Sequence, residues 1–539
     1  MKEIIKKFIP SFLLGWYHFF LAFLAAFFYQ FPSQKLTVIG ITGTNGKSTV
    51  VDLATRIFEE AGYRVASLSS IKFKIKEKER PNTLRMTMPG RFIIQKFLRE
   101  AVSSGCQYAV LEVTSEGIKQ YRHKFINFSV AVFTNLSPEH IEAHGSFEKY
   151  REAKAELFKA TKEAHIINIE DKNAEYFLEF SANKKYTYGL NKGDINNKDI
   201  QFKLRLIGDF NVYNALAATC LGLSQGISLE FCKKVLERVE GIPGRMEEVI
   251  SEPFKVFVDY AFTPNALEKV YQTLKATNNK QQATRMICVL GAAGGGRDKW
   301  KRPVLGELAR KYCDEVIVTN EDPYDEEPIK IINQVARGTS NKAKKILDRR
   351  EAINEALKIA KKEDIIIITG KGCESSICVA GGKKMPWDDR EIVREQFRKL
   401  KIKNDNVKFK ILPHIADLKI KVFGKTKEEL FKNVLLAMTK SQKGENFGQK
   451  IERKIKIESI NLISLLVDFL SEALYLSQVN KEIYNNIKFK KFSDTELEGE
   501  LFGQKVERFG EDIKAVTHHD LKVEEGKDKT WEAIVLFDI

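Results

Sequence analysis

Residues 38–49 hold the part of the chain best suited to chemistry, because they read VIGITGTNGKST. An apolar run breaks into a glycine-rich loop, and Lys47 and Ser48 then open a segment with apolar periodicity. A strand, a glycine-rich turn and a helix suit a phosphate site, since loop N–H groups surround the oxygens and the helix N-terminus favours anions. Lys47 can reach the outer phosphates, and the hydroxyl of Ser48 or Thr49 can ligate Mg²⁺. We therefore expect a nucleotide triphosphate site; because Gly40 departs from the standard glycine spacing, an ordinary glycine-rich turn is the alternative.

Three further residues could serve the same site. Glu112 ends the apolar run QYAVLEV, at the sheet edge where parallel α/β folds place ligand groups. A carboxylate there could hold Mg²⁺ against the β- and γ-phosphates. His140 follows a second apolar run, and Lys154 lies in the helical stretch YREAKAELF. Taken singly, a histidine or a lysine is more often a surface group than a ligand.

Alternating strands and helices must position these groups. Apolar runs at residues 107–113, 128–136 and 165–170 are typical of buried parallel strands. The segment FNVYNALAATCLGLSQG has the spacing of a helix. After GIPGR at 241–245, a predicted hinge, the strand-like runs KVFVDY, RMICVLG, DEVIVTN and DIIIITG alternate with helical stretches. The pattern predicts two successive α/β domains with mostly parallel sheets.

The rest of the chain changes character. Charged sequence at 398–408 predicts an irregular linker, and the residues after it combine alternating strands with a long apolar helix around 460–475. A chain of 539 residues should hold about three or four domains. Its net charge of +16 favours anionic partners such as nucleotides, nucleic acid or an anionic membrane. Seven cysteines without a CxxC pair fit a reducing, cytoplasmic compartment.

The N-terminal region is unusually aromatic. Residues 12–29 carry almost no charge, and the basic sequence MKEIIKK precedes them. Residues 8–31 could lie on a membrane surface, pack against their own domain, or span the membrane. A span with a cytoplasmic N-terminus would place the phosphate loop outside, away from ATP. We expect a cytoplasmic protein that is peripheral at the inner membrane face and has no removable signal peptide.

Taken together, the motifs resemble those of the Mur ligases, most closely the MurE-like branch of UDP-N-acetylmuramoyl-peptide synthetases. The resemblance rests, in order from residue 35 to about 400, on TGTNGKST, LEVTSEG, TNLSPEH with AHGSFEKYREAKAELF, GDFNVYNALAA, GIPGRME, VDYAFTPNALE, GGGRDKWKRP, TNEDPYDEEP and GKGCE. It implies a P-loop central ATP-binding domain at 35–240 and a Rossmann-like amino-acid-binding domain at 241–400, after an N-terminal helix at 1–34. It also implies amide-bond formation, in which ATP phosphorylates a substrate carboxylate and an amine attacks the acyl phosphate.

The same resemblance implies roles for single residues. Lys47, His140 and Lys154 would be catalytic, with Lys154 carbamylated so that it binds metal. Ser48 and Glu112 would hold one Mg²⁺, and His140 a second. The implied ATP-binding residues are Gly43, Thr44, Asn45, Gly46, Lys47, Ser48, Thr49, Asn135, Asn211, Asn214, Arg245 and Asp259. The implied substrate-binding residues are Thr114, Ser115, Arg297, Asp298, Lys299, Asp322, Gly370, Lys371 and Glu374.

Departures from the family pattern point to a change of substrate. Phe262, Cys373 and Glu116 each stand where the family has histidine. Tyr324 stands where an arginine binds the distal carboxylate of meso-diaminopimelate, and tyrosine cannot form a bidentate pair with a carboxylate. Lysine or another amino acid is therefore the expected amine. Because residues 8–31 stand in place of the family's UDP-binding domain, we expect a muramoyl peptide linked either to a nucleotide or to a lipid as acceptor, and a monomeric enzyme.

The last segment offers a second set of acids. Asp417 and Asp538 lie in apolar, strand-like surroundings, one near each end of the segment. Brought together, they could coordinate a hard cation with the carboxylate of Ile539. The alternative is that each is a solvated acid at a strand end.

Residues 405–539 are similar to archease, with HIAD for HTAD and IKAVTHH for IKAVTYH. The similarity implies a small α+β domain that activates an RtcB-type tRNA ligase. Asp417 and Asp538 would bind Ca²⁺ or another divalent cation, and Lys514 would be an essential basic residue near them. Residues 518–520 are further candidates at this place.

The sequence thus predicts an ATP-dependent amide ligase of peptidoglycan precursor synthesis fused to an archease-like domain. The alternative is chiefly an accessory factor for an RNA ligase, with a Mur-like module that acts on another substrate. A third class, a membrane-tethered scaffold with a degenerate ligase, would bind no ATP.

Overall fold

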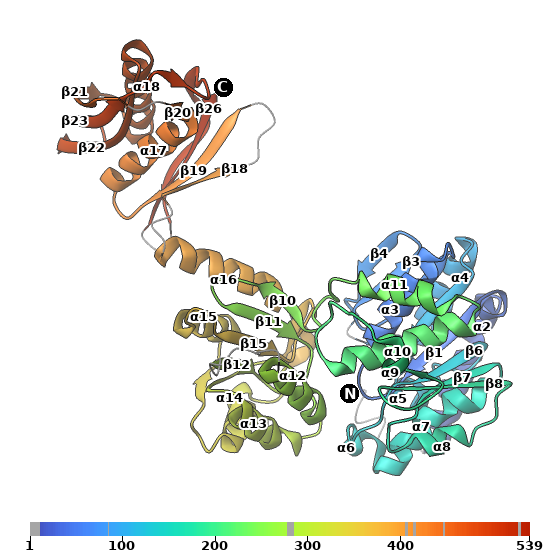
Figure 1. Cartoon of the computed structure of the whole chain (residues 1–539). Helices are drawn as coiled ribbons and strands as arrows, with labels where there is room; N and C mark the ends of the chain where they lie inside the picture. The colour runs from blue at the N-terminus through green and yellow to red at the C-terminus, as the bar shows by residue number, and fades with distance from the viewer. Residues whose placement is uncertain are drawn as a thin grey trace. The chain divides into compact units, whose positions relative to one another are not determined.

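The computed structural model describes residues 11–84, 86–276, 285–404, 408–412, 417–445, 448–526 and 530–539. They form two compact units, residues 1–397 and 398–539, and each is described by itself. Figure 1 labels the helices and strands of both units.

A nine-stranded sheet forms the first half of the larger unit, in the order β4-β3-β2-β5-β1-β6-β7-β8-β9. All pairs from β2 to β9 through the centre are parallel, whereas β3 and β4 extend one edge as antiparallel strands. The central strand β1 pairs with β5 and β6. The strands are β1 Thr37–Thr42, β2 Val65–Leu68, β3 Lys72–Ile75, β4 Lys78–Pro81, β5 Tyr108–Glu112, β6 Phe128–Phe133, β7 Ala164–Asn168, β8 Lys184–Gly189 and β9 Ile195–Asn196.

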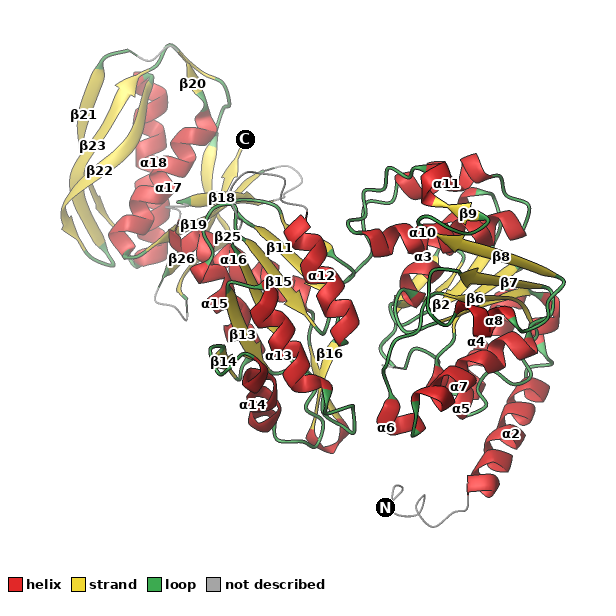
Figure 2. Cartoon of the chain, turned by 60° about the horizontal axis from the view of Figure 1, so that its bottom comes forward, coloured by secondary structure: helices red, strands yellow, loops and turns green. Residues whose placement is uncertain are grey.

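Helices cover both faces of this sheet, as Figure 2 shows. Alternate residues of β1 serve the two faces: Ile39 joins the core under α3, α10 and α11, whereas Val38 joins the core under α4, α7 and α8. Burial on both faces explains why the strands read as continuous apolar runs. The predicted strands at 107–113, 128–136 and 165–170 are β5, β6 and β7. The helices are α3 Lys47–Glu60, α4 Arg91–Ser103, α5 Ser115–Lys119, α6 Ile141–His144, α7 Phe147–Ala160, α8 Ala174–Leu178, α9 Asn197–Ile200, α10 Asp209–Ser224 and α11 Leu229–Glu237.

A six-stranded sheet follows in the same unit, in the order β10-β11-β15-β12-β13-β14. It is parallel except for the antiparallel edge strand β10. The four predicted strand-like runs are β11, β12, β13 and β15, so the predicted succession of two mostly parallel α/β sheets is confirmed. The strands are β10 Glu247–Ile250, β11 Lys255–Asp259, β12 Met286–Leu290, β13 Glu315–Thr319, β14 Lys344–Ile346 and β15 Ile365–Thr369, with a separate hairpin of β16 Ser376–Val379 and β17 Lys383–Pro386. The helices are α12 Pro264–Ala276, α13 Lys301–Tyr312, α14 Pro328–Gly338, α15 Arg349–Ile359 and α16 Asp389–Asn404.

The predicted irregular linker at 398–408 is wrong for its first seven residues. Helix α16 continues through them to Asn404. Its sequence is rich in arginine, lysine and glutamate, which are good helix formers, and the buried Val393 and Gln396 secure its first turns. Residues 405–407 lie outside the described residues.

The smaller unit is an α+β domain, as predicted. Its sheets have the orders β18-β19-β26-β25, β21-β23-β22 and β20-β24. Helices α17 Lys427–Gln442 and α18 Leu462–Asn480 share one core with them. The strands are β18 Phe409–Leu412, β19 Leu418–Gly424, β20 Gly444–Glu445, β21 Lys450–Glu458, β22 Glu482–Phe492, β23 Glu496–Lys505, β24 Arg508–Phe509, β25 Ala515–Glu525 and β26 Trp531–Asp538.

Among the described residues, one helix is long and apolar enough to cross a membrane, and it is α18. Its leucines belong to the core of the smaller unit, so composition alone is weak evidence for a span. The N-terminal helix α2, Ser11–Phe28, contains a shorter apolar stretch at Leu14–Phe28. It packs on α4, and its alanines are buried. Of the predicted segment 8–31, residues 8–10 lie outside the described residues.

Candidate active site

The phosphate loop joins the end of β1 to the start of α3. Gly43 and Gly46 adopt φ angles of 146° and 84°, which glycine reaches at the lowest cost. A Cβ at Gly43 would come within 1.9 Å of Thr134 Oγ1, and one at Gly46 within 2.4 Å of Asn214 Oδ1. The second half of the loop is held by Asn135, whose Oδ1 accepts from the Asn45 N–H at 3.0 Å. The loop conformation therefore depends on both glycines.

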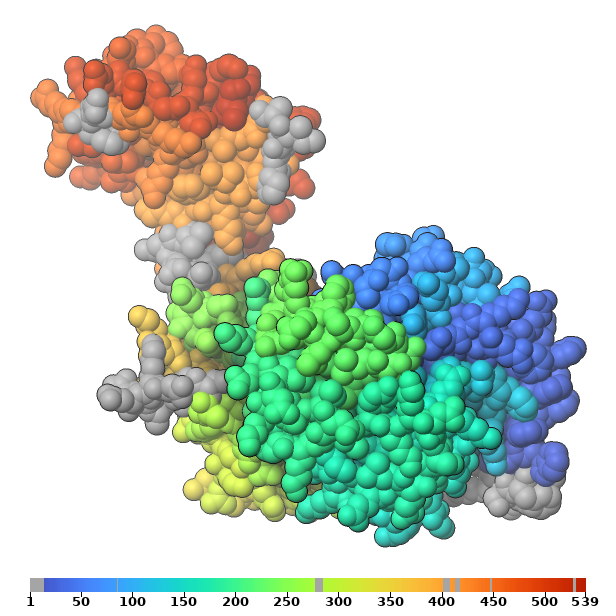
Figure 3. Space-filling model, turned by 45° about the vertical axis from the view of Figure 1, so that its right-hand side comes forward, coloured from blue at the N-terminus to red at the C-terminus, as the bar shows by residue number. Residues whose placement is uncertain are grey.

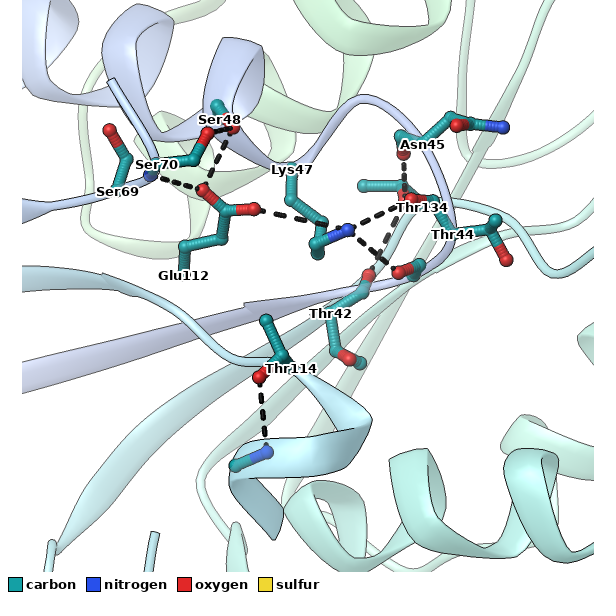
Figure 4. A network of polar contacts seen from close by, with 12 residues as sticks. Thr42, Thr44, Asn45, Lys47, Ser48, Ser69, Ser70, Glu112, Thr114 and Thr134 are labelled. Carbon is teal, nitrogen blue, oxygen red and sulfur yellow. Dashed lines mark hydrogen bonds and ion pairs between the residues drawn. The ribbon is translucent and has the colours of Figure 1, made fainter. Parts of the chain in front are cut away.

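Lys47 folds back over this loop, as Figure 4 shows. Its Nζ donates to the carbonyl oxygens of Gly43 and Thr44 at 3.1 and 2.8 Å and lies 3.8 Å from Glu112 Oε1. Burial lowers the pKa of Lys47, and the Glu112 carboxylate opposes that effect. A phosphate chain at the helix N-terminus would supply the negative charge that this buried cation lacks.

Glu112 is buried at the end of β5 and is held by Ser48, at the start of α3, and by Ser70, which follows β2. Ser48 Oγ donates to Glu112 Oε2 at 2.8 Å, and the Ser70 N–H donates to the same oxygen at 2.9 Å. Arg245 Nη2 donates to Ser70 Oγ at 3.2 Å. One carboxylate and one hydroxyl side by side form a donor set that suits the hard ion Mg²⁺.

Lys154 and His140 approach the loop from the other side. Lys154 Nζ donates to the Gly43 oxygen at 2.7 Å, and its side chain is 2% exposed. Burial and the nearby Lys47 hold its pKa well below the usual value. His140 Nδ1 lies 3.5 Å from Glu116 Oε1. Burial, followed by Arg297 and Lys154, lowers the pKa of His140 to about 2, so its imidazole is neutral at physiological pH and can act as a metal ligand.

These groups line one cavity of about 630 Å³ in the larger unit. Every implied ATP-binding and ligase metal residue contributes to its wall, as do Thr114 and Ser115. In the described residues, no group of three or more His, Cys, Asp or Glu side chains is arranged so that it could hold a metal ion. A metal in this cavity would therefore need ligands beyond such side chains, such as Ser48 and phosphate oxygens.

One end of the cavity is aromatic. Its three aromatic residues were not predicted from the sequence as site residues. Phe210, Tyr213 and Tyr188 line it beside Asn211 and Asn214. Tyr213 donates a hydrogen bond to Glu170, and Asn214 Nδ2 donates to Asn211 Oδ1 at 3.2 Å. Flat rings with amide groups beside them suit a nucleobase. The two aromatic positions within FNVYN, Phe210 and Tyr213, could have indicated this base-binding end from the sequence.

The opposite end of the cavity holds only part of the implied amino-acid site. Its wall includes Arg297, Asp322, Gly370 and Glu374. Lys371 is fully buried beneath them; its Nζ lies 3.0 Å from both Asp322 oxygens and 2.6 Å from Glu374 Oε2. It therefore orders the two acids rather than facing a ligand.

Asp298 and Lys299, also implied substrate-binding residues, do not line the cavity. Asp298 Oδ1 accepts from the Glu142 N–H at 3.2 Å, and the Lys299 N–H donates to Glu142 Oε1 at 3.2 Å. The two residues thus connect the halves of the larger unit. Spacing alone could not separate them from Arg297, which precedes them in the chain.

Glu321 belongs to this end of the cavity and was missed from the sequence. It is 5% exposed, lines the cavity, and its Oε2 has no hydrogen-bond partner among the described residues. Burial, with Asp322 beside it, raises the pKa of Glu321 to about 7. The doubled acid in TNEDPY was the signal. With Tyr324 also in the wall, this end is rich in acids and lacks the arginine of the family pattern.

Glu139 and Lys301 were also not predicted from the sequence. They form a buried ion pair that links the two halves of the larger unit. Lys301 Nζ donates to Glu139 Oε1 at 2.7 Å, and both side chains are 3% exposed. The ring of Phe262 lies 5.0 Å from Lys301 Nζ. Phe262, which stands where the family has histidine, thus offers a cation–π contact to the buried lysine.

In the smaller unit, the strand register brings the predicted acids together. Leu418 pairs with Phe537, and Ala515 pairs with Asp538. Continuing the first register by one residue places Asp417 opposite Asp538. Lys514 Nζ donates to the main-chain oxygen of Ile539 at 3.0 Å. The implied residues therefore meet at one end of the β19-β26-β25 sheet.

Residues 518–520 lie further along β25, where the pairing with β26 shifts register between Thr517 and Lys522. Asp520 pairs with Lys419 at 3.0 Å. Both histidines, His518 and His519, are exposed. This group is thus separate from the end of the sheet that carries Asp538.

The fold and the loop define a nucleotide-dependent enzyme of the P-loop α/β class. Residues 41–222 match the Mur ligase middle domain, residues 244–372 match the Mur ligase glutamate ligase domain, and residues 409–539 match the archease protein family.

A UDP-N-acetylmuramoyl-L-alanyl-D-glutamate–2,6-diaminopimelate ligase from Caldanaerobacter subterraneus subsp. tengcongensis is 39% identical over 398 residues, covering 70% of this chain and 81% of that protein. A UDP-N-acetylmuramyl-tripeptide synthetase from Roseiflexus sp. is 36% identical, covering 70% of this chain and 82% of that protein. The chain belongs to the Mur ligase family of ATP-dependent ligases, and it carries an archease domain at its C-terminal end.

Solved structures agree on the fold. Folylpolyglutamate synthase of Mycobacterium tuberculosis superposes with a TM-score of 0.53 at 17% identity, covering 65% of this chain and 92% of that chain. MurF from Acinetobacter baumannii gives a TM-score of 0.51 at 20% identity, covering 65% of this chain and 76% of that chain.

The buried Glu139–Lys301 pair generates a stability prediction. Lys301→Met leaves Glu139 buried without a partner, which should destabilise the larger unit by about 3–5 kcal/mol. Urea denaturation of the full chain measures the loss. Lys299→Met, at a lysine that is 58% exposed, is the matched control and should change little. The double variant Glu139→Leu/Lys301→Met should recover most of the loss, and a double variant as unstable as the single one would contradict this account.

Proposed function

We propose that this protein joins an amino acid to the carboxylate of a muramoyl peptide, with ATP, in peptidoglycan precursor synthesis. The observation that carries the proposal is the convergence of Lys47, Glu112, His140 and Lys154 on one cavity that also holds an acid-rich end. The division of labour would follow the domains at 35–240, which bind ATP, and 241–400, which bind the amino acid.

The reaction would proceed in two transfers. The acceptor carboxylate attacks the γ-phosphorus of ATP and ADP leaves, which gives an acyl phosphate. The amine then attacks the acyl carbon, inorganic phosphate leaves, and the amine nitrogen gives up a proton as the amide forms. Two bound Mg²⁺ ions would supply charge neutralisation for the phosphates. The chain's own part is to hold the reacting groups in line and to stabilise developing negative charge with Lys47.

Ser48, Glu112 and His140 would hold these ions. Lys154 would add a carbamate formed from its neutral amine and CO₂, with release of one proton. The burial of Lys154 beside Lys47 supports this assignment, since both effects favour the neutral amine that carbamylation requires.

The amine is proposed to be an amino acid without a distal carboxylate, such as lysine. Glu321, Asp322 and Glu374 place three acids at this end of the cavity, and the cations near them are Lys371, the buried Arg349 and Arg297. Tyr324 offers no guanidinium there. Position 324 thus offers no bidentate partner for a distal carboxylate, and the acids beside it suit a side-chain ammonium. The relatives named above are diaminopimelate ligases or tripeptide synthetases, so this proposal sets the chain apart from some of them.

For the smaller unit we propose activation of an RtcB-type tRNA ligase, with Ca²⁺ or another divalent cation at Asp417 and Asp538. The register that sets these acids opposite each other, with Lys514 beside them, supports the proposal. The main-chain oxygen of Ile539 already accepts from Lys514, so Ile539 would be a weaker third ligand. A protein whose chief role is this accessory one, with a ligase for another substrate, is the second candidate.

We propose that the ligase activity belongs to a monomer in the cytoplasm, at the inner face of the membrane. The exposed aromatic residues of α2 support the membrane location.

The ligase proposal predicts ATP-dependent phosphate release only when acceptor and amino acid are both present. Lysine should be used in preference to meso-diaminopimelate, alanine and glutamate. Lys47→Ala and Lys154→Ala should each abolish the reaction, measured by phosphate release and mass spectrometry of the product.

Acetate should partly restore Lys154→Ala, because it supplies the lost carboxylate, and should leave its matched control Lys47→Ala inactive. Unchanged activity of Lys47→Ala would refute the proposal, and equal rescue of both variants would refute the carbamate.

The archease proposal predicts that the full chain accelerates a cognate RtcB-type ligase when divalent cation is present. Asp538→Asn should remove the acceleration and weaken cation binding measured by calorimetry. Asp494→Asn, at an acid that is 60% exposed and pairs with Lys427, is the matched control. Full acceleration by Asp538→Asn would contradict the proposal.

A further inference from the structure

Helix α2 presents its aromatic side chains to solvent. Ala22, Ala25 and Ala26 are at most 1% exposed, whereas Trp16 and Phe28 are each 70% exposed. Tyr17, Phe20 and Phe27 are also more than half exposed. An amphipathic helix on a soluble domain normally buries its large apolar residues, and α2 does the reverse.

Packing holds α2 in this orientation. Phe19 and Phe23 both contact the ring of Phe125, at centroid distances of 5.0 and 5.5 Å. The helix also packs on α4. The helix carries no Asp, Glu, Lys or Arg from Ser11 to Phe28. The outward aromatic row is therefore a fixed part of the surface, and in Figure 3 the N-terminal segment, dark blue, lies on the outside of the larger unit.

Helix α4 extends the same face. Phe92 and Ile93 are 42% and 37% exposed, and the Phe92 ring lies 6.4 Å from that of Phe28. One turn further, Lys96 is 63% exposed. We call the exposed aromatic residues of α2 together with Phe92 and Ile93 the aromatic face. A continuous apolar face of this kind marks an interaction surface.

Basic groups adjoin the aromatic face. Besides Lys96, Arg91 at the start of α4 has its pKa lowered by burial, then by Arg122. Among the described residues, neither arginine forms an ion pair with a carboxylate. Glu116 acts on Arg122, and Lys96 pairs with Glu100 at 3.7 Å, so Arg91 is the guanidinium that this face offers to an anionic partner.

One short segment connects the aromatic face to the cavity wall. Phe19 contacts the ring of Tyr121 at 6.4 Å. Gln120 and Arg122, on either side of Tyr121, line the cavity. The route from helix α2 to the site of carboxylate activation thus runs through one short segment.

We propose that the aromatic face docks on an anionic membrane surface and thereby brings the cavity to acceptor carboxylates that are anchored to the bilayer through a lipid phosphate. Trp16 and Tyr17 suit the headgroup level, where such side chains gather, and the basic groups suit anionic lipid. The substrate part of this proposal rests on the ligase function proposed above. A second copy of the chain is the competing occupant of the same face.

Vesicle flotation with the full chain tests the docking surface. Vesicles of phosphatidylethanolamine and phosphatidylglycerol should carry wild type, and Trp16→Ser/Phe20→Ser/Phe27→Ser should lower binding by more than about tenfold. The control Ile329→Ser/Leu347→Ser changes apolar residues that are 40% and 52% exposed elsewhere on the unit, and it should float like wild type. Equal flotation of the triple variant would overturn the proposal, as would a dimer that sedimentation shows to depend on these three residues.

Activity with two acceptors tests the substrate class. The triple variant should ligate a soluble, nucleotide-linked acceptor at the wild-type rate, which also shows that it folds, and should lose most activity on an acceptor embedded in vesicles. Equal activity on the embedded acceptor would refute the link between docking and substrate. If wild type ligates neither acceptor, the proposed function fails, whereas flotation still decides the docking surface.

Discussion

Two buried lysines that share one carbonyl oxygen set the electrostatics of the ligase site. Lys47 and Lys154 both donate to the oxygen of Gly43, and the carboxylate of Glu112 is the nearest compensating charge. Burial lowers the pKa of both amines, so the positive charge of Lys47 is costly unless an anion joins it, whereas Lys154 can be held as a neutral amine. The site is thus suited to a ligand with several negative charges. The loop, the sheet and the contacts between the two halves of the larger unit hold these side chains in position.

The fold meets this demand by placing the loop at the centre of the nine-stranded sheet. Strand β1 is buried on both faces, which fixes the position of the loop and of the start of α3 that follow it. Glu112 lies at the end of the adjacent strand β5. Contacts from the second half of the unit, such as Arg245 with Ser70 and Lys301 with Glu139, close the cavity from the opposite side. Chemistry and packing therefore depend on the same few elements.

Sequence reasoning was strongest where neighbours in the chain determine structure. The loop, its glycines and the parallel strands followed from local pattern, and family resemblance supplied His140 and Lys154. It was weakest where distant segments meet. Glu139 and Lys301 are 162 positions apart, and no local sequence pattern near either residue predicts their ion pair. Glu321 was missed because the two adjacent acids in TNEDPY do not show which of them is buried without a hydrogen-bond partner. The prediction of an irregular linker at 398–408 was wrong for a different reason: its charged residues were interpreted as irregular, although lysine and arginine favour a helix.

The two units carry separate chemistry on one chain, and the central claim concerns the larger one: its cavity activates a carboxylate as an acyl phosphate. An acceptor labelled with ¹⁸O in that carboxylate tests this most directly. Our account predicts that one labelled oxygen passes to inorganic phosphate for each amide formed, observed by mass spectrometry or ³¹P NMR. Inorganic phosphate released without label, while amide accumulates, would contradict it.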